Sequence, residues 1–273
     1  MSKYRSVSNC GSAIGEAIGA SMEKALAEKL MEVANLYGYH YVTSGVVETK
    51  SGKRAKKLLM SDNNGNQYNI DGVLANENMQ PLILFESKYI RYQKHNRDKA
   101  SWICHAHSGI RRRYHSIRSS IAVLAGSWSN SSQAMLTSND INLFFIPFEF
   151  ICELLSELDI DFNWGEKEST KAKDAWYKYN NLTTAQKDYI GIQMVSLIEE
   201  NLCSLIENIL DDTIDREITK IVVEIVSNLG EIKFFEFDNV ESALLFLSQD
   251  DLKGAFFTAD SLSLFDASPT FDT

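Results

Sequence analysis

The residues with the clearest chemical potential are two acids and a lysine in the stretch between Tyr68 and Lys88. Asp71 lies in a short apolar run, and Glu86 and Lys88 lie in the apolar run that follows it. Isolated charges on buried strands are costly, so three of them in two such runs indicate a shared task. Carboxylate oxygens are the ligands that Mg²⁺ prefers, and a lysine beside them could hold or deprotonate a water molecule. These residue types therefore suggest metal-assisted hydrolysis.

A tight reversal of the chain is needed to bring these groups together. The two apolar runs flank the polar turn Asn76-Glu77-Asn78, which is the pattern of a β-hairpin. Glu86 and Lys88 are two positions apart, so their side chains leave the same face of the second strand. The hairpin could place Asp71 beside that face, and the sequence predicts a cation site at one edge of a sheet.

These residues also carry a family resemblance. Asp71, followed fifteen positions later by Glu86-Ser87-Lys88, resembles the core motif of the PD-(D/E)xK nuclease superfamily, which includes most type II restriction endonucleases. Ile70 stands where the superfamily often, but not always, has its proline. The resemblance covers roughly residues 12 to 150.

The resemblance implies a fold and a set of ligands. The fold is α/β, a restriction-endonuclease-like α/β/α core with a mixed central sheet. Mg²⁺ would be held by the carboxylates of Asp71 and Glu86 and by the backbone carbonyl of Ser87. Lys88 would act on the attacking water.

An acidic residue on the first helix often faces the metal site in this superfamily. The resemblance therefore adds Glu23 to the catalytic candidates, with Glu16 as the second choice. The alternative for Glu23 is an ordinary solvated position on the helix surface, and the residue pattern leaves that alternative open.

Periodicity supplies the elements that would position the site. Apolar spacing predicts a first helix from Ser12 to Tyr37, with Ser12 as the N-cap and Gly38 as the stop. Further elements are expected, in order, as a strand at 39–48, a short strand at 58–61, the hairpin, a helix at about 94–114, strands at 120–126 and 141–147, and a helix at 148–158. This order matches the α-β-β-β-α-β core of the superfamily.

Basic residues crowd the segment that follows Lys88, where Asp98 is the only acid. We expect them to contact the backbone of double-stranded DNA, and a solvated basic helix is the alternative. They are Arg91, Lys94, Arg97, Lys99, Arg111, Arg112, Arg113 and Arg118. The basic run from Lys50 to Lys57 could touch phosphates as well.

Charge divides the chain into two unlike parts. Residues 1–148 hold 18 Lys and Arg against 11 Asp and Glu, whereas residues 149–273 hold 9 against 26. We therefore predict a catalytic core at 1–160 and an acidic α+β extension at 161–273, which could pack as part of one domain. The extension is expected to hold a helix at 185–210, strands at 216–227 and 231–237, and a helix at 240–247.

Two other Glu-x-Lys triplets compete with the proposed motif. Glu231-Ile232-Lys233 follows Asp215 by sixteen positions, and Glu48-Thr49-Lys50 borders the basic run. The hairpin motif is preferred because its surroundings are cationic and its acids lie in apolar strands. An ordinary ion-pair cluster remains the structural alternative for the hairpin residues.

Several other classes find no support in the sequence. The four cysteines form no C-x-x-C pair, which argues against a structural zinc site or a disulfide framework. Neither a signal peptide nor a membrane-spanning run is expected, so a cytoplasmic protein is predicted. No G-x-x-x-x-G-K-[ST] motif suggests an ATPase, and no nucleophile elbow suggests a serine hydrolase.

The sequence therefore predicts a Mg²⁺-dependent endonuclease that cuts double-stranded DNA. A chain of this size without an ATPase motif resembles a type II restriction endonuclease, and that resemblance implies a homodimer. The alternatives are another defence, repair or junction-resolving nuclease of the same superfamily, or a DNA-binding subunit without cleavage activity of its own.

Overall fold

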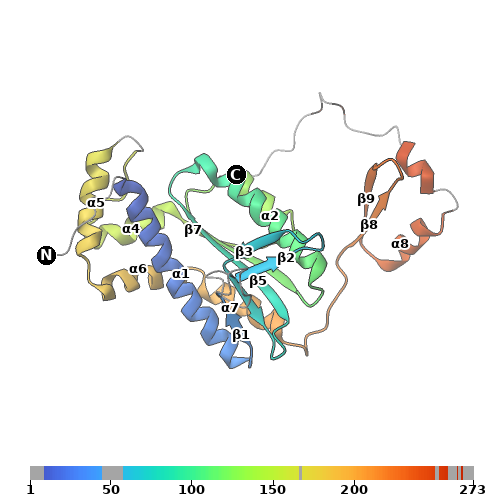
Figure 1. Cartoon of the computed structure of the whole chain (residues 1–273), viewed down its shortest axis with the longest axis horizontal. Coiled ribbons are helices and arrows are strands. Elements are labelled where there is room, and N and C mark those ends of the chain that lie inside the picture. The colour runs from blue at the N-terminus through green and yellow to red at the C-terminus, as the bar shows by residue number, and fades with distance from the viewer. Residues whose placement is uncertain are drawn as a thin grey trace. The chain divides into compact units, whose positions relative to one another are not determined.

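A mixed five-stranded sheet lies at the centre of the computed structural model (Figure 1). The structure describes residues 9–44, 58–165, 168–249 and 252–257, together with positions 263 and 266. The strands, in spatial order, are β1 (His40–Val42), β4 (Gly72–Ala75), β5 (Pro81–Ile90), β6 (Ser119–Gly126) and β7 (Asn142–Pro147). The first three pair antiparallel and the last three parallel. The predicted α/β class with a mixed central sheet is confirmed.

Helices cover one face of this sheet. They are α1 (Cys10–Leu36), α4 (Phe148–Ser156), α5 (Ser169–Asn181), α6 (Thr184–Ser196) and α7 (Glu199–Leu210). The predicted apolar stripe of α1, which includes Ile14, Ile18 and Met22, is fully buried against alternate residues of β5 and β6. Asn9 caps this helix, because its Oδ1 accepts a 3.1 Å hydrogen bond from the amide of Ser12, the residue expected to be the cap.

The opposite face carries α2 (Asn96–Arg113), which follows the short helix η1 (Gln93–His95), and α3 (Asn130–Thr137). Alternate residues on this side, Leu84 of β5 and Leu124 of β6, belong to the cores beneath these helices. A small hairpin, β2 (Leu58–Ser61) and β3 (Gln67–Ile70), packs against α2. The Tyr68 hydroxyl donates to Asp62 Oδ2 at 3.0 Å and lies 3.2 Å from His105 Nε2 of α2.

The predicted central hairpin differs from the observed one at its first strand. The run expected as one strand is divided at Asp71, because β3 pairs with β2 in the small sheet and β4 pairs with β5 in the large one. Of the strand expected at 39–48, the described residues show His40–Val42 as β1, and positions 45–48 lie outside the described residues. The basic run 50–57 lies outside the described residues.

The chain separates into two compact units, Met1–Leu210 and Asp211–Asp272. The sequence had placed this boundary at residue 160. The first unit extends further because α5 and α6 pack on α1, with Ile190 and Met194 in its core. The expected helix at 185–210 is two helices, α6 and α7, separated at Leu197 and Ile198.

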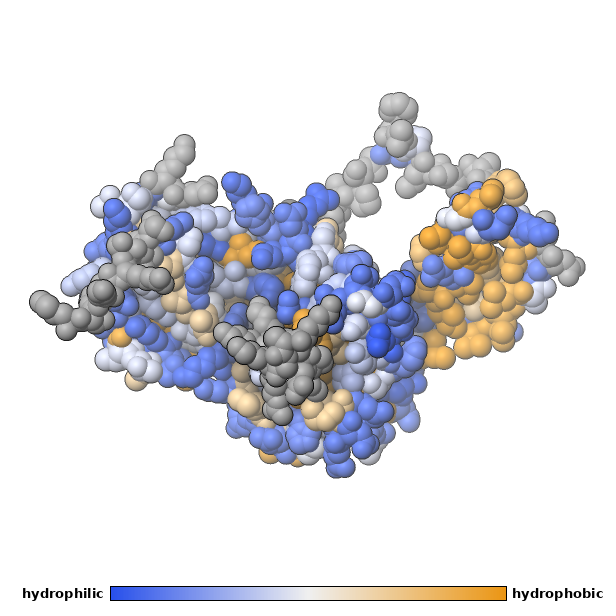
Figure 2. All heavy atoms as spheres, in the orientation of Figure 1, coloured by the Kyte–Doolittle hydropathy of each residue, from blue (hydrophilic) through white to orange (hydrophobic). Residues whose placement is uncertain are grey.

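The second unit is a two-stranded antiparallel sheet with one helix packed on it. Its elements are β8 (Ile221–Val226), β9 (Ile232–Phe237), α8 (Val240–Leu247) and η2 (Leu252–Phe257). Phe246 of α8 packs on Phe235 and Phe237. Many apolar side chains remain on its surface (Figure 2), among them Phe234, which is 62% exposed.

None of the described helices is both long enough and apolar enough to cross a membrane.

Candidate active site

The candidate acids lie at two neighbouring strands of the large sheet, Asp71 immediately before β4 and Glu86 within β5. Gly72 pairs with Phe85, so Asp71 stands opposite Glu86 just where the chain leaves the small hairpin. The amide of Asp71 donates to Glu86 Oε2 at 3.4 Å, and the amide of Ser87 donates to Asp71 Oδ2 at 3.0 Å. The Glu86 carboxylate is therefore held by the backbone of Asp71, and the Asp71 carboxylate by the backbone of Ser87.

Lys88 completes the group. Its Nζ lies 2.7 Å from Asp71 Oδ2 and 2.5 Å from Glu86 Oε1, so one ammonium bridges both carboxylates. Asp71, Glu86 and Lys88, which the sequence singled out, are thus brought together within ion-pair distance.

Burial sets the electrostatics of this group. Glu86 is 1% exposed, whereas Asp71 and Lys88 keep about a quarter of their side-chain surface in contact with solvent. Burial raises the pKa of Glu86 to about 7, and the charge of Asp71 adds to this while Lys88 opposes it. Burial alone would lower the pKa of Lys88, but Glu86 and Asp71 outweigh it and the pKa is raised.

The residues of this group fit a divalent cation. Glu86 Oε1 is buried and has no hydrogen-bond partner among the described residues. Its interaction there is the ion pair with the ammonium of Lys88. The space between the two carboxylates already holds one positive charge, the ammonium of Lys88. Two carboxylates beside a partly exposed opening leave further coordination positions to water, as Mg²⁺ prefers.

The acids of α1 lie on the same side of the molecule as this group. Glu16 and Glu23 are both exposed, and both line a cleft that also includes Lys88. Burial raises the pKa of Tyr41, and the negative charges of Asp71, Glu23 and Glu86 raise it further. Glu23 is therefore near enough to act electrostatically on the same phenol as both site carboxylates, and its catalytic role stays a prediction.

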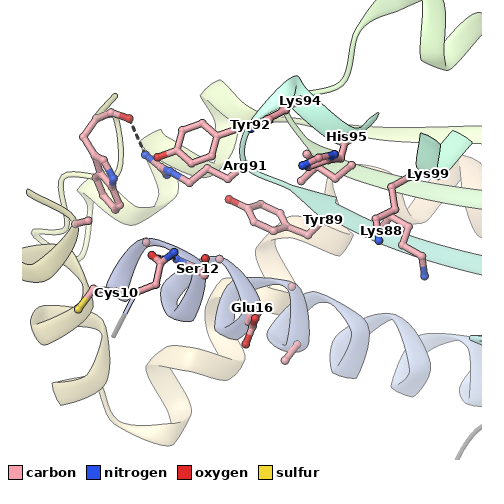
Figure 3. A pocket seen from close by; sticks show the side chains of 18 of the residues that line it. Cys10, Ser12, Glu16, Lys88, Tyr89, Arg91, Tyr92, Lys94, His95 and Lys99 are labelled. Atoms are coloured by element: carbon pink, nitrogen blue, oxygen red, sulfur yellow. Dashed lines mark hydrogen bonds between the residues drawn. The ribbon is translucent and has the colours of Figure 1, made fainter. Parts of the chain in front are cut away.

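The cleft beside this group has a volume of about 810 Å³ (Figure 3). One wall is the surface of α1 from Asn9 to Glu23, and the other includes the end of β5 and the segment after it. Lys94, His95 and Lys99 belong to the second wall, and Ser169, Ala172 and Lys173 of α5 line the cleft as well. Lysines thus outnumber acids in its lining.

Only some of the predicted DNA-binding residues are placed at this cleft. Lys94 and Lys99 line it, and Arg97 is exposed on the first turn of α2. Arg91 lines the cleft too, but its side chain is buried, and its Nη2 donates to the carbonyls of Phe162 at 2.6 Å and Trp164 at 3.0 Å. The prediction of a phosphate-contacting Arg91 is therefore wrong for this structure, in which the guanidinium anchors the 162–164 segment.

Arg111, Arg112 and Arg113 lie at the opposite end of α2, and Arg118 lies in the connection between α2 and β6. Arg111 is fourteen residues from Arg97, about 21 Å along the helix axis. Three of these side chains donate from Nη1 to backbone carbonyls: Arg111 to Asp140 at 3.3 Å, Arg113 to Asp62 at 2.8 Å and Arg118 to Ile209 at 2.9 Å. Arg112 is exposed.

Sequence reasoning missed a buried imidazole near the group. His107 of α2 is 1% exposed, and neither ring nitrogen has a hydrogen-bond partner among the described residues. Burial lowers its pKa to about 3, the charges of Arg111 and Lys88 lower it, and Asp71 raises it. The ring is therefore neutral. Its position four residues after Ile103 and three before Ile110 was the available signal, since both are buried positions of the same helix.

The competing motif has a different setting. Glu231 Oε2 accepts a 2.9 Å hydrogen bond from Ser227 Oγ across the turn between β8 and β9. Asp215 lies in an irregular, exposed segment before β8. The Glu48-Thr49-Lys50 triplet lies outside the described residues.

Comparisons with known proteins give no family. No family model matches the chain, and no curated protein matches it. One solved structure, described as a protein of unknown function, AF1548, is similar at 9% identity over 65% of this chain and 99% of that chain, with a TM-score of 0.31. A likeness of that size supports no conclusion, so function has to be argued from the site.

Proposed function

We propose that the protein is a Mg²⁺-dependent endonuclease that hydrolyses DNA phosphodiester bonds. The observation that carries this proposal is the convergence of Asp71, Glu86 and Lys88, with one ammonium 2.7 Å and 2.5 Å from two carboxylates on neighbouring strands. The spacing of these residues is that of the PD-(D/E)xK motif. Two acids and a lysine in this arrangement suit cation binding and water activation better than a purely structural ion pair, because Ser87 and Lys88 line a cleft that three further lysines also line.

Each residue has a defined task in this proposal. The carboxylates of Asp71 and Glu86 and the carbonyl of Ser87 would hold the cation, and their task is ligation rather than proton transfer. The cation, when bound, supplies charge neutralisation at the phosphate and lowers the pKa of a coordinated water. Lys88 would turn from the carboxylates to the attacking water and hold it in line with the phosphate. Glu23 would face the same site from α1.

The arrangement of the elements supports a restriction-endonuclease-like core as part of the proposal. The helix α1 precedes the antiparallel strands, and α2 connects β5 to the parallel strand β6. The α-β-β-β-α-β order of the superfamily is met by α1, β1, β4, β5, α2 and β6, with the small hairpin β2–β3 as an addition.

We propose double-stranded DNA as the substrate and a homodimer as the acting form, as in a type II restriction endonuclease that cuts a specific site in the cytoplasm. The exposed cations Lys94, Arg97 and Lys99 would contact phosphates beside the cleft. Two copies of one site are the simplest way to cut both strands of a symmetric sequence.

Incubation of the purified protein with plasmid DNA and Mg²⁺ tests this function. Discrete fragments are expected, a smear would mean a non-specific nuclease, and a mobility shift without cutting would reduce the protein to a DNA-binding subunit. Lys88→Ala should abolish cutting and keep DNA binding measured in EDTA. Lys24→Ala is the matched control, because Lys24 is exposed on α1 and pairs with Asp188. Full activity of Lys88→Ala would refute the assignment.

A further inference from the structure

The β8–β9 hairpin of the second unit carries apolar side chains on both of its faces. Side chains alternate between two faces along a strand. One set, which includes Phe235 and Phe237, lies under α8, where the ring of Phe246 packs on theirs at centroid distances of 4.5 Å and 5.3 Å. The other set leaves the opposite face, which is named the open face. Its members are Val222, Glu224 and Val226 of β8 and Ile232, Phe234 and Glu236 of β9.

The four apolar side chains of the open face are accessible to solvent in the described structure. Their exposed fractions run from 48% for Val222 to 62% for Phe234. Figure 2 shows apolar residues of this unit at its surface. A sheet with one solvated face alternates apolar and polar residues, whereas strands covered on both faces are almost continuously apolar. Because five of the six residues of β8 are apolar, the strand has the composition of one that is covered on both sides.

The open face has the dimensions of one helix. Strands of six residues are about 20 Å long, and two neighbouring strands are about 10 Å wide. An α-helix of about thirteen residues has the same length and a similar diameter. The other face of the sheet already packs a helix, α8, through an aromatic side chain. A two-stranded sheet is at best marginally stable alone, so a second covering layer would stabilise it.

The acids of the open face decide what kind of helix fits. Glu224 and Glu236 lie on different strands, and each is paired in register with an apolar residue of the other strand. Glu224 has no ion-pair partner among the described residues, and Lys220 lies 4.0 Å from Glu236 at an exposed position. Covering a carboxylate without a cation beside it costs free energy. Whatever covers the apolar side chains must therefore bring lysine or arginine with it.

Charge also argues against three other occupants. Residues 211–272 hold 4 Lys and Arg against 14 Asp and Glu, an imbalance that repels nucleic acids and anionic membranes. A second copy of the face would bring its own two glutamates towards Glu224 and Glu236. Residues 258–273 of the same chain hold three acids and no base, so they lack the required cations as well.

We propose that the open face docks a basic amphipathic helix of another protein. The apolar side chains of that helix cover Val226, Ile232 and Phe234. Its lysine or arginine residues pair with Glu224 and Glu236. The surface belongs to the second unit alone, so the proposal does not depend on nuclease activity.

A labelled peptide of about fourteen residues tests the docking surface on the full chain. The peptide forms a helix with leucines along one face and lysines along the other, and a second peptide has glutamates in place of the lysines. Fluorescence anisotropy should show that the lysine peptide binds at least about tenfold more tightly than the glutamate peptide. Absence of binding by the lysine peptide, or equal binding of both peptides, would overturn the proposal.

Two variants test whether the peptide binds to the open face. Phe234→Ser should weaken binding of the lysine peptide about tenfold, and Glu224→Gln should weaken it about threefold. Leu229→Ser and Glu217→Gln are the matched controls, because Leu229 is 81% exposed in the turn and Glu217 is exposed before β8. Both controls should stay within about twofold of the wild-type affinity. Equal losses in variants and controls would place the peptide elsewhere and reject the surface.

Two further measurements separate a partner helix from occupants that this chain could supply itself. Because Phe234 is exposed, Phe234→Ser should leave Tm and the sedimentation coefficient unchanged. A large loss of Tm, or a dimer that this change dissociates, would show that the chain or a second copy covers the face. Removal of residues 258–273 should leave the affinity for the lysine peptide unchanged, and a gain of about tenfold would assign the face to that segment. Each of these contrary results would overturn the proposal.

Discussion

Glu86 is the residue on which the site depends most. Its carboxyl is almost fully buried, faces Asp71 across two strands and has Lys88 as its charged partner. The cost of burying an acid is tolerated here because an ammonium lies beside it, and a divalent cation would neutralise it more completely.

Replacement of Glu86 by Gln should change how stability depends on pH. The folded-state pKa of Glu86 is raised from 4.5 to about 7, so its favourable contribution is complete below pH 4.5 and is lost as the pH rises through 7. The wild type should therefore lose up to about 3 kcal/mol more stability than Glu86→Gln between pH 5 and pH 8. Urea unfolding of both proteins at several pH values measures this, and parallel curves would contradict it.

Mg²⁺ should stabilise the folded protein through the same carboxylates. Cation binding needs ionised ligands, so the rise in Tm with added Mg²⁺ should be larger at pH 8 than at pH 6. Asp71→Asn should lose most of the rise, whereas Asp98→Asn, an exposed change at the start of α2, should keep it. Thermal melts with and without EDTA check the result.

At the residue scale, the sequence predicted the central group and misjudged its neighbours. The motif spacing was enough to select Asp71, Glu86 and Lys88, because two adjacent strands fix which residues meet. The contacts of Arg91 could not be predicted in the same way, because the carbonyls that its side chain binds are more than seventy positions away in the sequence. His107 was missed although its spacing from Ile103 and Ile110 places it on the buried face of α2, because the residue type alone favours an exposed position.

At the scale of elements, Asp71 is positioned by the point at which the chain leaves the small sheet and enters the large one. The residue ends the pairing of β3 with β2 and precedes the pairing of β4 with β5. The sequence predicted the reversal between β4 and β5 but not this division, because apolar residues continue on both sides of Asp71. The division between α6 and α7 was missed for the same reason, since apolar residues continue through it.

The contact between α1 and α6 requires a residue without a side chain. A Cβ at Gly191 would overlap the carbonyl oxygen of Ser21, so Gly191→Ala should destabilise the protein by about 2 kcal/mol or more. Gly11→Ala is the control, because its Cβ would meet only ordinary contacts at 3.5 Å and 3.9 Å. It should change stability by less than about 1 kcal/mol. Equal losses in chemical denaturation would show that the close approach is not the cause.

At the scale of the whole molecule, charge and structure divide at the same place. Residues 1–210 hold 23 basic and 23 acidic residues, whereas residues 211–272 hold 4 and 14 and so carry the entire net charge of −10. The excess of acidic residues in the C-terminal half was evident from the sequence, but the predicted boundary between the two parts was residue 160. The contacts of α5 and α6 with α1 are long-range and leave no local signal.

Removal of the acidic unit should strengthen DNA binding. A chain that ends at Leu210 keeps every described residue of the three hydrophobic cores around the large sheet. It loses ten net negative charges. Its affinity for duplex DNA should rise about tenfold at low salt, and the gain should fade as salt screens the charge. Filter binding across a salt series measures this, and an unchanged affinity at every salt concentration would contradict it.

The attachment of Tyr68 to His105 has a mechanical consequence. Tyr68 lies three residues before Asp71 on an extended stretch, and its hydroxyl is held by an exposed ring on α2. Displacement of His105 would remove one contact of the Tyr68 hydroxyl and leave its hydrogen bond to Asp62, which lies between β2 and β3. The exposed side of α2 is therefore connected to Asp71 through the Tyr68 hydroxyl and the strand β3.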